Sequence, residues 1–131
     1  MYRKMLLSTL LVCSFSALSN IVVIVNPANE SSISAEEIVR IYTGRSNAFN
    51  AVNLAESAPL RAQFDEKGVG RSSAQLKAHW SKLVFTGKGT PPAELASEEA
   101  VLDFVANNPQ AIGYVGADKV TSAVKVVHTI N

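Results

Sequence analysis

The sequence is poor in the side chains that form covalent cross-links and metal sites. Among its 131 residues there is one cysteine, Cys13, and it lies in an N-terminal apolar segment. The rest of the chain therefore has no thiol, which excludes an internal disulfide, thiol redox chemistry and a thiolate metal site. The two histidines, His79 and His128, lie far apart, and neither has a further ligand residue at a suitable spacing. We expect no metal and no cofactor.

An excess of positive charge is also missing. The chain has 12 basic and 11 acidic residues, and without Arg3 and Lys4 in the N-terminal segment its formal charge is −1. Nucleic acid and anionic membranes are therefore not expected as partners. The glycine-rich segment 68–73 follows a helix and lacks the Gly-Lys-Ser/Thr ending of a phosphate loop, and no nucleophile elbow is recognisable. The sequence favours a binding protein over an enzyme.

The first nineteen residues have the pattern of a secretory signal peptide. Arg3 and Lys4 precede an apolar run from Met5 to Ala17, and Ala17-Leu18-Ser19 is a small-x-small processing site. The run has 13 residues, fewer than the roughly 20 that span a bilayer as a helix. Cleavage after residues 1–19 is therefore favoured over a retained anchor.

A lipoprotein acylated at Cys13 is the weaker alternative. Val12 stands where such a site requires a small residue, and cleavage there would leave a very short apolar core. We therefore expect residues 20–131 to form a single periplasmic domain that does not insert into the membrane.

Apolar runs and helix-capping residues alternate along the rest of the chain. Apolar runs closed by turn residues predict strands, and a serine before acidic residues or an apolar stripe predicts a helix start. Strands are expected at 21–25, 51–55, 111–115 and 124–130, and helices after Ser34, near Ala58, after Ser72 or Ser73 up to Phe85, and after Ser97 up to Asn107. Gly44 and the segment 86–89 are expected to end two of these helices, and Pro91-Pro92 to begin an extended loop. Strands separated by helices require crossovers, so the fold is predicted to be α/β with an at least partly parallel sheet.

Four aromatic residues fall on the apolar stripes of the expected helices. They are Phe64, Trp80, Phe85 and Phe104. We expect all four to pack in the core.

The segment from Ala51 to Phe64 has the residue pattern of an anion site. An expected strand runs into Ser57, Pro59 and then Arg61 on the first turn of a helix. This order directs a hydroxyl, the N–H groups of Leu60 and Arg61 and a guanidinium toward one point. Helix N-termini and arginine both bind oxyanions, so the segment predicts an anion contact.

A purely structural interpretation of the same residues stays open. In it, the serine caps the helix and Arg61 pairs with Glu56 or Asp65 on the surface. Arg71 and Ser72, in the glycine-rich segment, are predicted as secondary anion contacts.

Three motifs in their order resemble the phosphate-binding-protein family of ABC transporters. They are the helix end Ile38–Arg45 (IVRIYTGR), the strand leading to Ser57 and Arg61, and the strand Ala111–Val115 (AIGYV). Family members typically carry an (I/L)-F-x-G-K helix end, an S-G-T-R-like helix start and an A-I-G-Y strand. The segment HWSKLVFTGKG resembles small single-domain members, and the likeness covers nearly all of residues 21–130.

The resemblance implies the type II periplasmic-binding-protein fold, in which two α/β lobes close on a ligand. This chain has the length of a single lobe, with a mixed, mostly parallel sheet flanked by helices. Where the family has Ser-Gly-Thr, this chain has Ser57-Ala58-Pro59. The proline removes an N–H donor and the threonine hydroxyl is missing, so only weak anion binding is expected.

The sequence thus predicts an exported module that binds phosphate or a related oxyanion at Ser57, Leu60 and Arg61, with Arg71 and Ser72 as further contacts. The resemblance implies an ABC permease or another envelope protein as partner, or a homodimer that completes the half-site. The alternative is a single-lobe envelope adaptor with a decayed ligand site. Phosphate, sulfate, molybdate and a carboxylate are not distinguished.

Overall fold

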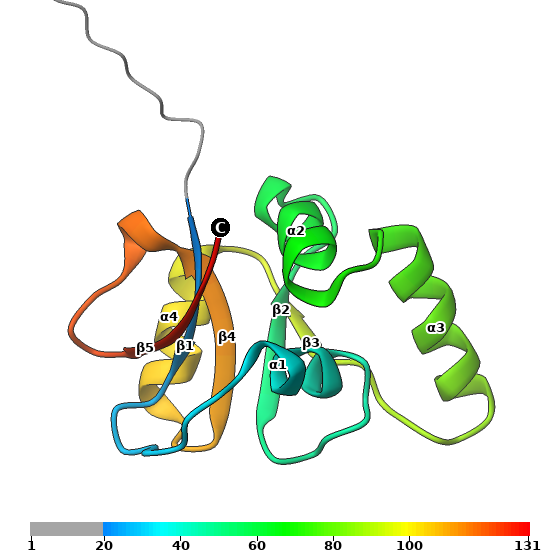
Figure 1. Ribbon diagram of the computed structural model, residues 1–131, viewed down its shortest axis with the longest axis horizontal. Helices are drawn as coiled ribbons and strands as arrows, with labels where there is room; N and C mark the ends of the chain where they lie inside the picture. The colour runs from blue at the N-terminus through cyan, green and yellow to red at the C-terminus, as the bar shows by residue number, and fades with distance from the viewer. Residues whose placement is uncertain (1–19) are drawn as a thin grey trace, which may run out of the picture.

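The structure is a computed structural model that describes residues 20–131, so the expected signal peptide and Cys13 lie outside the described residues. Figure 1 shows a five-stranded sheet covered by helices, with one helix, α3, standing apart from the sheet. The elements in chain order are β1 (Ile21–Val25), α1 (Ala35–Tyr42), β2 (Asn50–Leu54), α2 (Pro59–Phe64), the π-helical turn η1 (Asp65–Val69), α3 (Ser73–Phe85), β3 (Ala93–Leu95), α4 (Glu98–Asn107), β4 (Ala111–Gly116), the 3-10 turn η2 (Ala117–Lys119) and β5 (Lys125–Ile130). None of the helices in this part of the chain is long and apolar enough to cross a membrane.

The sheet is mixed, with the strand order β3-β2-β4-β1-β5. Strand β1 is antiparallel to both of its neighbours, whereas β2 is parallel to β3 and to β4. Four strands therefore run in one direction and only β1 runs against them. The predicted α/β class with a mixed, mostly parallel sheet is confirmed, and the carboxyl ends of β2, β3 and β4 meet at one edge.

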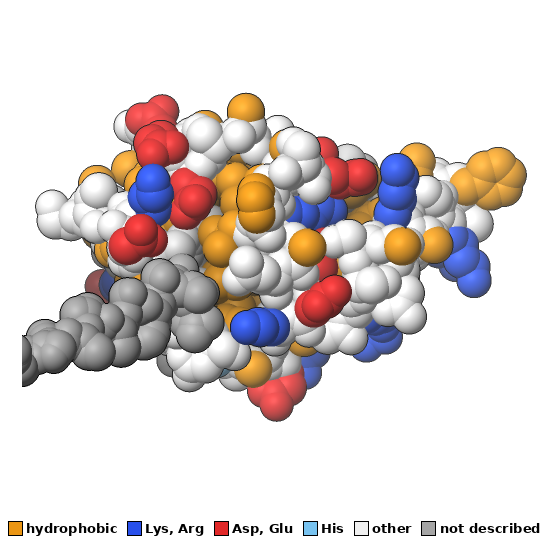
Figure 2. Space-filling view, turned by 90° about the horizontal axis from the view of Figure 1, so that it is seen from above, with side chains coloured by type: hydrophobic (Ala, Val, Ile, Leu, Met, Phe, Trp, Pro, Cys, Tyr) orange, Lys and Arg blue, Asp and Glu red, His pale blue; other side chains and the backbone are white. Residues whose placement is uncertain are grey.

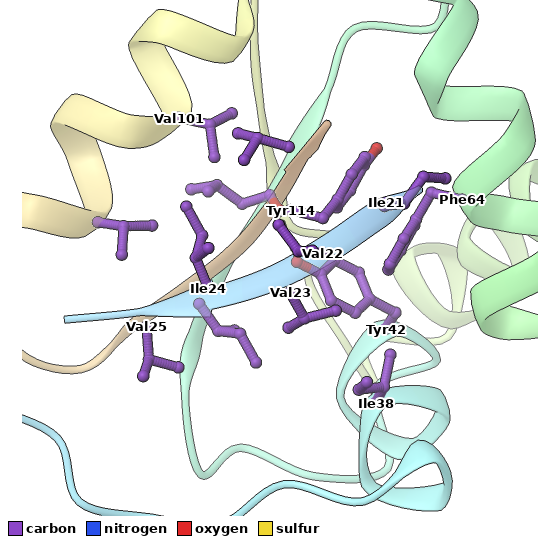
Figure 3. Packing of buried hydrophobic residues seen from close by; sticks show 14 of the residues in the cluster. Ile21, Val22, Val23, Ile24, Val25, Ile38, Tyr42, Phe64, Val101 and Tyr114 are labelled. Atoms are coloured by element: carbon purple, nitrogen blue, oxygen red, sulfur yellow. Dashed lines mark hydrogen bonds between the residues drawn. The ribbon is translucent and has the colours of Figure 1, made fainter. Parts of the chain in front are cut away.

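The first strand forms the centre of the core. All five residues of its IVVIV sequence are buried, because β1 lies between β4 and β5 and is covered on both faces (Figure 3). A continuous apolar run of this kind is what a strand buried on both faces requires.

Helices cover both faces of the sheet, as two consecutive residues of β4 demonstrate. A Cβ added to Gly113 would lie 2.7 Å from a side-chain carbon of Val101 on α4. The next side chain, Tyr114, points to the opposite face, where its ring stacks on Phe64 of α2 with centroids 3.7 Å apart. Tyr42 of α1 meets Phe64 edge-on at 4.9 Å. The fold therefore has three layers, with α4 on one face and α1 and α2 on the other (Figure 1).

The predicted helix starts and stops are confirmed where short-range chemistry sets them. Ser34, Ser72 and Ser97 each accept a hydrogen bond from the backbone N–H three residues later. Gly44 and Gly87, which end α1 and α3, both have positive φ, at 84° and 69°, the conformation that glycine adopts most easily.

Two segments differ from expectation. The extended loop expected after Pro91-Pro92 contains the three-residue strand β3, which pairs in parallel with β2. Gly68 and Gly70 are expected to break the helix after Pro59; the helix instead continues through Gly68 as η1 and ends at Gly70, which has φ 83°. Three residues are too few for a period-2 pattern, which explains why the sequence does not reveal β3.

The expectation for Phe85 is wrong. Its side chain is 90% exposed, and the neighbouring Val84 is 51% exposed. Of the thirteen residues of α3 only Leu76 is buried, because the far end of this helix extends beyond the sheet (Figure 1). Phe64 is buried as expected, whereas Trp80 and Phe104 are half-buried.

Candidate functional site

A pocket lies at the edge of the sheet where β2 and β3 end. Its volume is about 380 Å³, and it opens between the start of α2 and the start of α4. We call it the edge pocket; it is lined by Leu54, Ser57, Ala58, Pro59, Leu60, Ala96, Ser97, Glu98 and Glu99. Ligands of open α/β sheets bind at the carboxyl ends of the strands, so this is the place where a binding site is expected.

The start of α2 offers donors to the edge pocket. Ala58 is the N-cap of α2 and supplies no side-chain acceptor, and Pro59 occupies the first turn. Ser57 is exposed and does not cap the helix, so that part of the structural interpretation is wrong. Because nothing in the side chain of Ala58 can accept the N–H groups of the first turn, the Leu60 N–H and the Ser57 hydroxyl are suited to an anion.

The start of α4 brings carboxylates to the same pocket. Glu98 accepts the N–H of Gly116 at 2.7 Å, and Glu99 lies 3.5 Å from the ammonium of Lys119. The pKa of Glu99 is lowered, chiefly because its own backbone N–H donates to the carboxylate and also because of Lys119. Figure 2, which looks onto this edge of the molecule, shows acidic side chains gathered on it. An anion in the edge pocket would therefore lie beside the carboxylates of Glu98 and Glu99.

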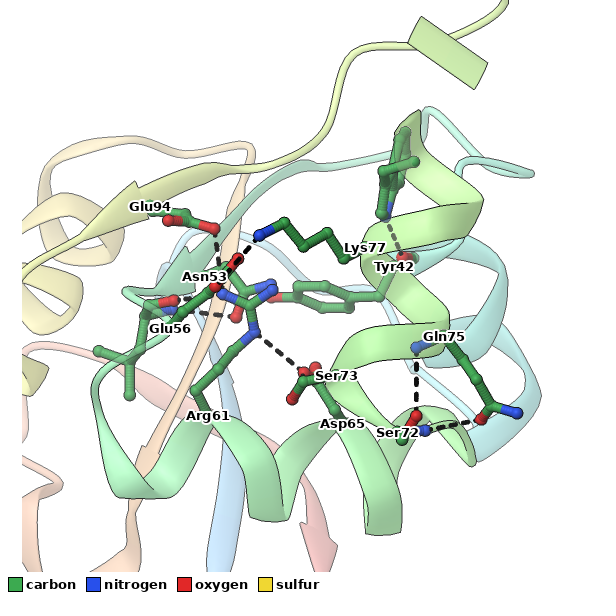
Figure 4. A network of polar contacts seen from close by, with 12 residues as sticks. Tyr42, Asn53, Glu56, Arg61, Asp65, Ser72, Ser73, Gln75, Lys77 and Glu94 are labelled. Atoms are coloured by element: carbon green, nitrogen blue, oxygen red, sulfur yellow. Dashed lines mark hydrogen bonds and ion pairs between the residues drawn. The ribbon is translucent and has the colours of Figure 1, made fainter. Parts of the chain in front are cut away.

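Arg61 does not line the edge pocket but is held inside the protein. It is only 7% exposed. Its Nε donates to Asp65 at 3.1 Å, and its Nη1 donates to the Leu54 carbonyl at 2.7 Å and to Glu94 at 3.1 Å (Figure 4). The predicted pairing with Asp65 is confirmed, although the pair is buried rather than on the surface. Glu56, the other expected partner, pairs with Lys77.

The charges around Arg61 keep its guanidinium fixed and ionised. Burial alone lowers the pKa of Arg61, but the Asp65 carboxylate and the hydrogen bond to Glu94 outweigh burial and raise it. Asp65 is 1% exposed and also accepts the Ser73 hydroxyl at 2.6 Å. This cluster ties the end of β2 to α2, to β3 and to the start of α3.

The two predicted secondary anion contacts lie apart from both the edge pocket and Arg61. Arg71 and Ser72 line a separate depression of about 310 Å³ together with Glu66, Gly70 and Gln75. Ser72 forms a capping box, in which its hydroxyl accepts the Gln75 N–H at 3.1 Å and its own N–H donates to the Gln75 side chain at 2.9 Å. The five predicted site residues thus fall into three places, and of these five only Ser57 and Leu60 line the edge pocket. A joint contact with one anion stays a prediction.

The fold is similar to solved phosphate-transport proteins over part of their length. An ABC-type phosphate transport receptor from Vibrio cholerae matches with a TM-score of 0.67 and 19% identity, covering 84% of this chain and 46% of the receptor. A putative phosphate ABC transporter substrate-binding protein with bound phosphate from Clostridium perfringens matches with a TM-score of 0.68 and 20% identity, covering 83% and 45%. PstS from Borrelia burgdorferi gives 0.62 and 12%, covering 83% and 47%. No family model matches the sequence, and no curated protein matches it.

The chain has a periplasmic-binding-protein-like fold. It spans less than half the length of the receptors that it matches, so the likeness concerns a single lobe, as the sequence motifs led us to expect. The similar structures are transport receptors rather than enzymes.

A buried polar network in this lobe, which sequence reasoning did not anticipate, fixes the strand that leads to the edge pocket. The Tyr114 hydroxyl donates to the Asn53 side chain and accepts the Leu54 N–H at 3.2 Å. The Tyr42 hydroxyl donates to the Val52 carbonyl at 2.8 Å. Burial raises the pKa of both tyrosines, so both remain neutral hydrogen-bond donors. The only sequence signal was the AIGYV motif, which marks the strand but not the partners of its tyrosine.

Metal-ligating side chains do not gather in the part of the chain that the structure describes. No group of three or more His, Cys, Asp or Glu residues that could hold a metal ion occurs among residues 20–131. His79 instead contacts the carbonyl of Thr43 at 2.8 Å, where it helps to attach α3 to the end of α1.

Proposed function

We propose that the protein is an exported oxyanion-binding module and that its ligand is hydrogen phosphate bound in the edge pocket. The observation that carries this proposal is the position of the pocket at the carboxyl ends of β2 and β3, where the N-termini of α2 and α4 converge. Helix N-termini favour negative charge through their free N–H groups and their dipoles. The likeness to phosphate receptors supports the same class of ligand.

The carboxylates beside the pocket favour an anion that carries a proton. Carboxylate groups such as those of Glu98 and Glu99 can only accept hydrogen bonds. The P–OH group of hydrogen phosphate can donate a hydrogen bond to such a carboxylate, whereas sulfate at neutral pH has no O–H group to donate. We therefore expect the edge pocket to prefer phosphate over sulfate, although both have the same shape and charge.

The expected affinity is low because the ligand shell is incomplete. Charge-assisted hydrogen bonds from Ser57 and Leu60 would contribute about 1.5–3 kcal/mol each before the cost of desolvation. A total of about 4 kcal/mol corresponds to a dissociation constant on the order of 1 mM. Tight capture would require a second binding surface from another envelope protein, such as an ABC permease.

Isothermal titration of the purified protein with phosphate and, separately, with sulfate tests the proposal. Leu60→Pro removes one backbone N–H from the first turn of α2, where that N–H has no intrahelical partner, while Leu60→Ala, the matched control, removes the same side-chain packing but keeps the N–H. We expect Leu60→Pro and Ser57→Ala to bind phosphate about tenfold more weakly, and Leu60→Ala to bind normally. Equal binding by the proline and alanine variants, or no heat with phosphate, would exclude the site. Cell fractionation tests export independently.

A further inference from the structure

Helix α3 is joined to the body of the protein along one narrow side (Figure 1). Of its thirteen residues only Leu76 is buried. Trp80 and Leu83 follow Leu76 at intervals of four and three residues, so these three side chains lie on the same face of the helix. Phe85, nine residues after Leu76, is 90% exposed on the opposite face. The helix therefore has one covered stripe and is otherwise open to solvent.

The indole of Trp80 is the main point of attachment. Its Nε1 donates to the Tyr42 carbonyl at 3.2 Å. The ring also lies close to two glycines, because a Cβ added to Gly44 would come within 2.8 Å of it and one added to Gly89 within 3.2 Å. The neighbouring His79 contacts the next carbonyl of the chain after Tyr42, at 2.8 Å. Both side chains thus bind carbonyls at the C-terminal end of α1, where carbonyls lack an intrahelical partner.

The other polar contacts of α3 lie near its start. The Ser73 hydroxyl donates to Asp65 at 2.6 Å. Lys77 lies 3.8 Å from Glu56, with side chains 69% and 52% exposed, and an exposed pair of this kind contributes little to stability. A helix held by so few buried contacts opens at a lower free energy than the core of the same protein.

Glycines in the left-handed conformation flank the helix at both ends. Gly70 precedes the N-cap Ser72 and has φ 83°, and Gly87 follows the C-cap Thr86 and has φ 69°. A Cβ added at either glycine would meet no atom within 4 Å, so nothing crowds the backbone there. Because glycine adopts many backbone conformations at little steric cost, both positions can serve as hinges.

We propose that α3 is a flap that opens from the body as a unit about Gly70 and Gly87, and that Trp80 holds it closed. A detached helix of thirteen residues is too short to stay fully folded in water. Its backbone amides therefore exchange with solvent while the flap is open. The opening requires no ligand.

The flap controls access to Arg61. Arg61 and Trp80 line the same groove, of about 430 Å³, beside α3, and Arg61 is only 7% exposed while the flap is closed. Ser73 of the flap donates to Asp65, the carboxylate that also binds Nε of Arg61. Opening removes one wall of the groove and one hydrogen bond of this cluster. The guanidinium then becomes accessible to solutes.

Native-state hydrogen exchange of the purified protein, in phosphate-free buffer and at urea concentrations below global unfolding, tests the flap. The amides of α3 should converge on one opening reaction and, after correction for intrinsic rates, exchange at least about tenfold faster than those of β1. Trp80→Phe keeps an aromatic ring but removes the indole donor, so it should speed α3 exchange by about fivefold. Phe85→Ala, the matched control on the exposed face, should leave α3 exchange unchanged.

A core variant separates flap opening from global unfolding. Val101 is 1% exposed on α4, on the other face of the sheet from α1, so it stays buried when the flap opens. Val101→Ala should speed exchange in β1 by about tenfold and leave α3 exchange unchanged. Equal acceleration of α3 and β1 in this variant would overturn the proposal, because α3 would then open only with the whole fold. Acceleration of α3 by Phe85→Ala as large as that by Trp80→Phe would also overturn it.

Modification by phenylglyoxal, followed by peptide mass spectrometry, measures access to Arg61. Arg40, whose side chain is 53% exposed on α1, is the internal reference. Trp80→Phe should raise the modification rate of Arg61 relative to Arg40 by about the same factor as it raises α3 exchange, and Phe85→Ala should not change it. Faster α3 exchange with an unchanged rate at Arg61 would refute control of Arg61 by the flap.

Discussion

Replacing Arg61 with methionine should destabilise the fold strongly, although arginine is normally a surface residue. Methionine keeps much of the volume of the side chain but removes the cation from a pair in which Asp65 is 1% exposed. The Asp65 carboxylate would lose its contact with Nε at 3.1 Å and would keep only the Ser73 hydroxyl. Breaking a buried pair by removing one partner costs about 3–5 kcal/mol. Glu94, which is 46% exposed, can turn to water and should add little.

The loss should be visible in both denaturant and thermal unfolding. A single domain of this size has a total stability of about 5–15 kcal/mol, so the loss is a large fraction of it and should lower the melting temperature by about 10–20 °C. The double variant Arg61→Met/Asp65→Asn leaves no unpaired charge in the core. It should therefore be more stable than Arg61→Met alone by at least about 1 kcal/mol.

The exposed pair between α3 and the segment after β2 provides the control. Lys77 lies 3.8 Å from Glu56, with side chains 69% and 52% exposed, so Lys77→Met should change stability by no more than about 0.5 kcal/mol. The reasoning fails if Arg61→Met is as stable as this control, or if adding Asp65→Asn makes the variant still less stable. The prediction also bears on ligand tests, since an Arg61 variant can lose phosphate binding simply by unfolding.

Three further predictions concern the fold. Gly44→Ala should cost more than Gly70→Ala although both glycines have similar φ, 84° and 83°, because the added Cβ at Gly44 would lie 2.8 Å from the tryptophan ring and at Gly70 would meet nothing within 4 Å. Urea unfolding should show that Gly70→Ala lowers the free energy of unfolding by about 1–2 kcal/mol and that Gly44→Ala lowers it by at least about 1 kcal/mol more. Equal losses would contradict this. Burial raises the pKa of Tyr42 and Tyr114, so these tyrosines ionise at a lower pH in the unfolded chain than in the folded protein. Their contribution to the free energy of unfolding should therefore be complete below about pH 10 and fall above it by up to about 1.4 kcal/mol per pH unit for each tyrosine. In an alkaline titration, tyrosinate absorbance from these residues should therefore appear with unfolding and not before it. Ser72→Ala, which removes the capping box of α3, should cost about 1 kcal/mol in the same urea assay, and no loss would show that the cap is dispensable.

Short-range chemistry made much of the fold predictable from the sequence. A serine hydroxyl bonds the N–H three residues later, as at Ser34 and Ser97, and a glycine such as Gly44 adopts the positive φ that ends a helix. These interactions are complete within a few residues, so the sequence carries all of the information that they need. The continuous apolar run of β1 likewise predicts a strand covered on both faces.

The position of Phe85 was not predictable in the same way. An apolar helix sequence does not show how far the neighbouring layer extends, and Phe85 follows the buried Leu76 by nine residues, which puts it on the opposite side of the helix. In the structure the body contacts the helix beside Trp80, whose indole donates to the Tyr42 carbonyl at 3.2 Å. The last residues of the helix pass beyond that contact. An apolar stripe therefore predicts a buried face only along the length that a partner covers, whether that partner is the same chain or another.

The inward orientation of Arg61 and the missed strand β3 are connected. Spacing alone allows Arg61 to reach Asp65 one helical turn later, or to turn toward Ser57 and an anion. The buried Asp65 carboxylate and the Leu54 carbonyl favour the inward orientation, and Glu94 on β3 adds a contact with Nη1 because β3 pairs with β2. When this segment is predicted as a loop, nothing in the sequence places Glu94 near Arg61. Nε and Nη1 of the guanidinium are engaged by Asp65, Glu94 and the Leu54 carbonyl, and Arg61 does not line the edge pocket. The ligand hypothesis therefore depends on Ser57 and the Leu60 N–H.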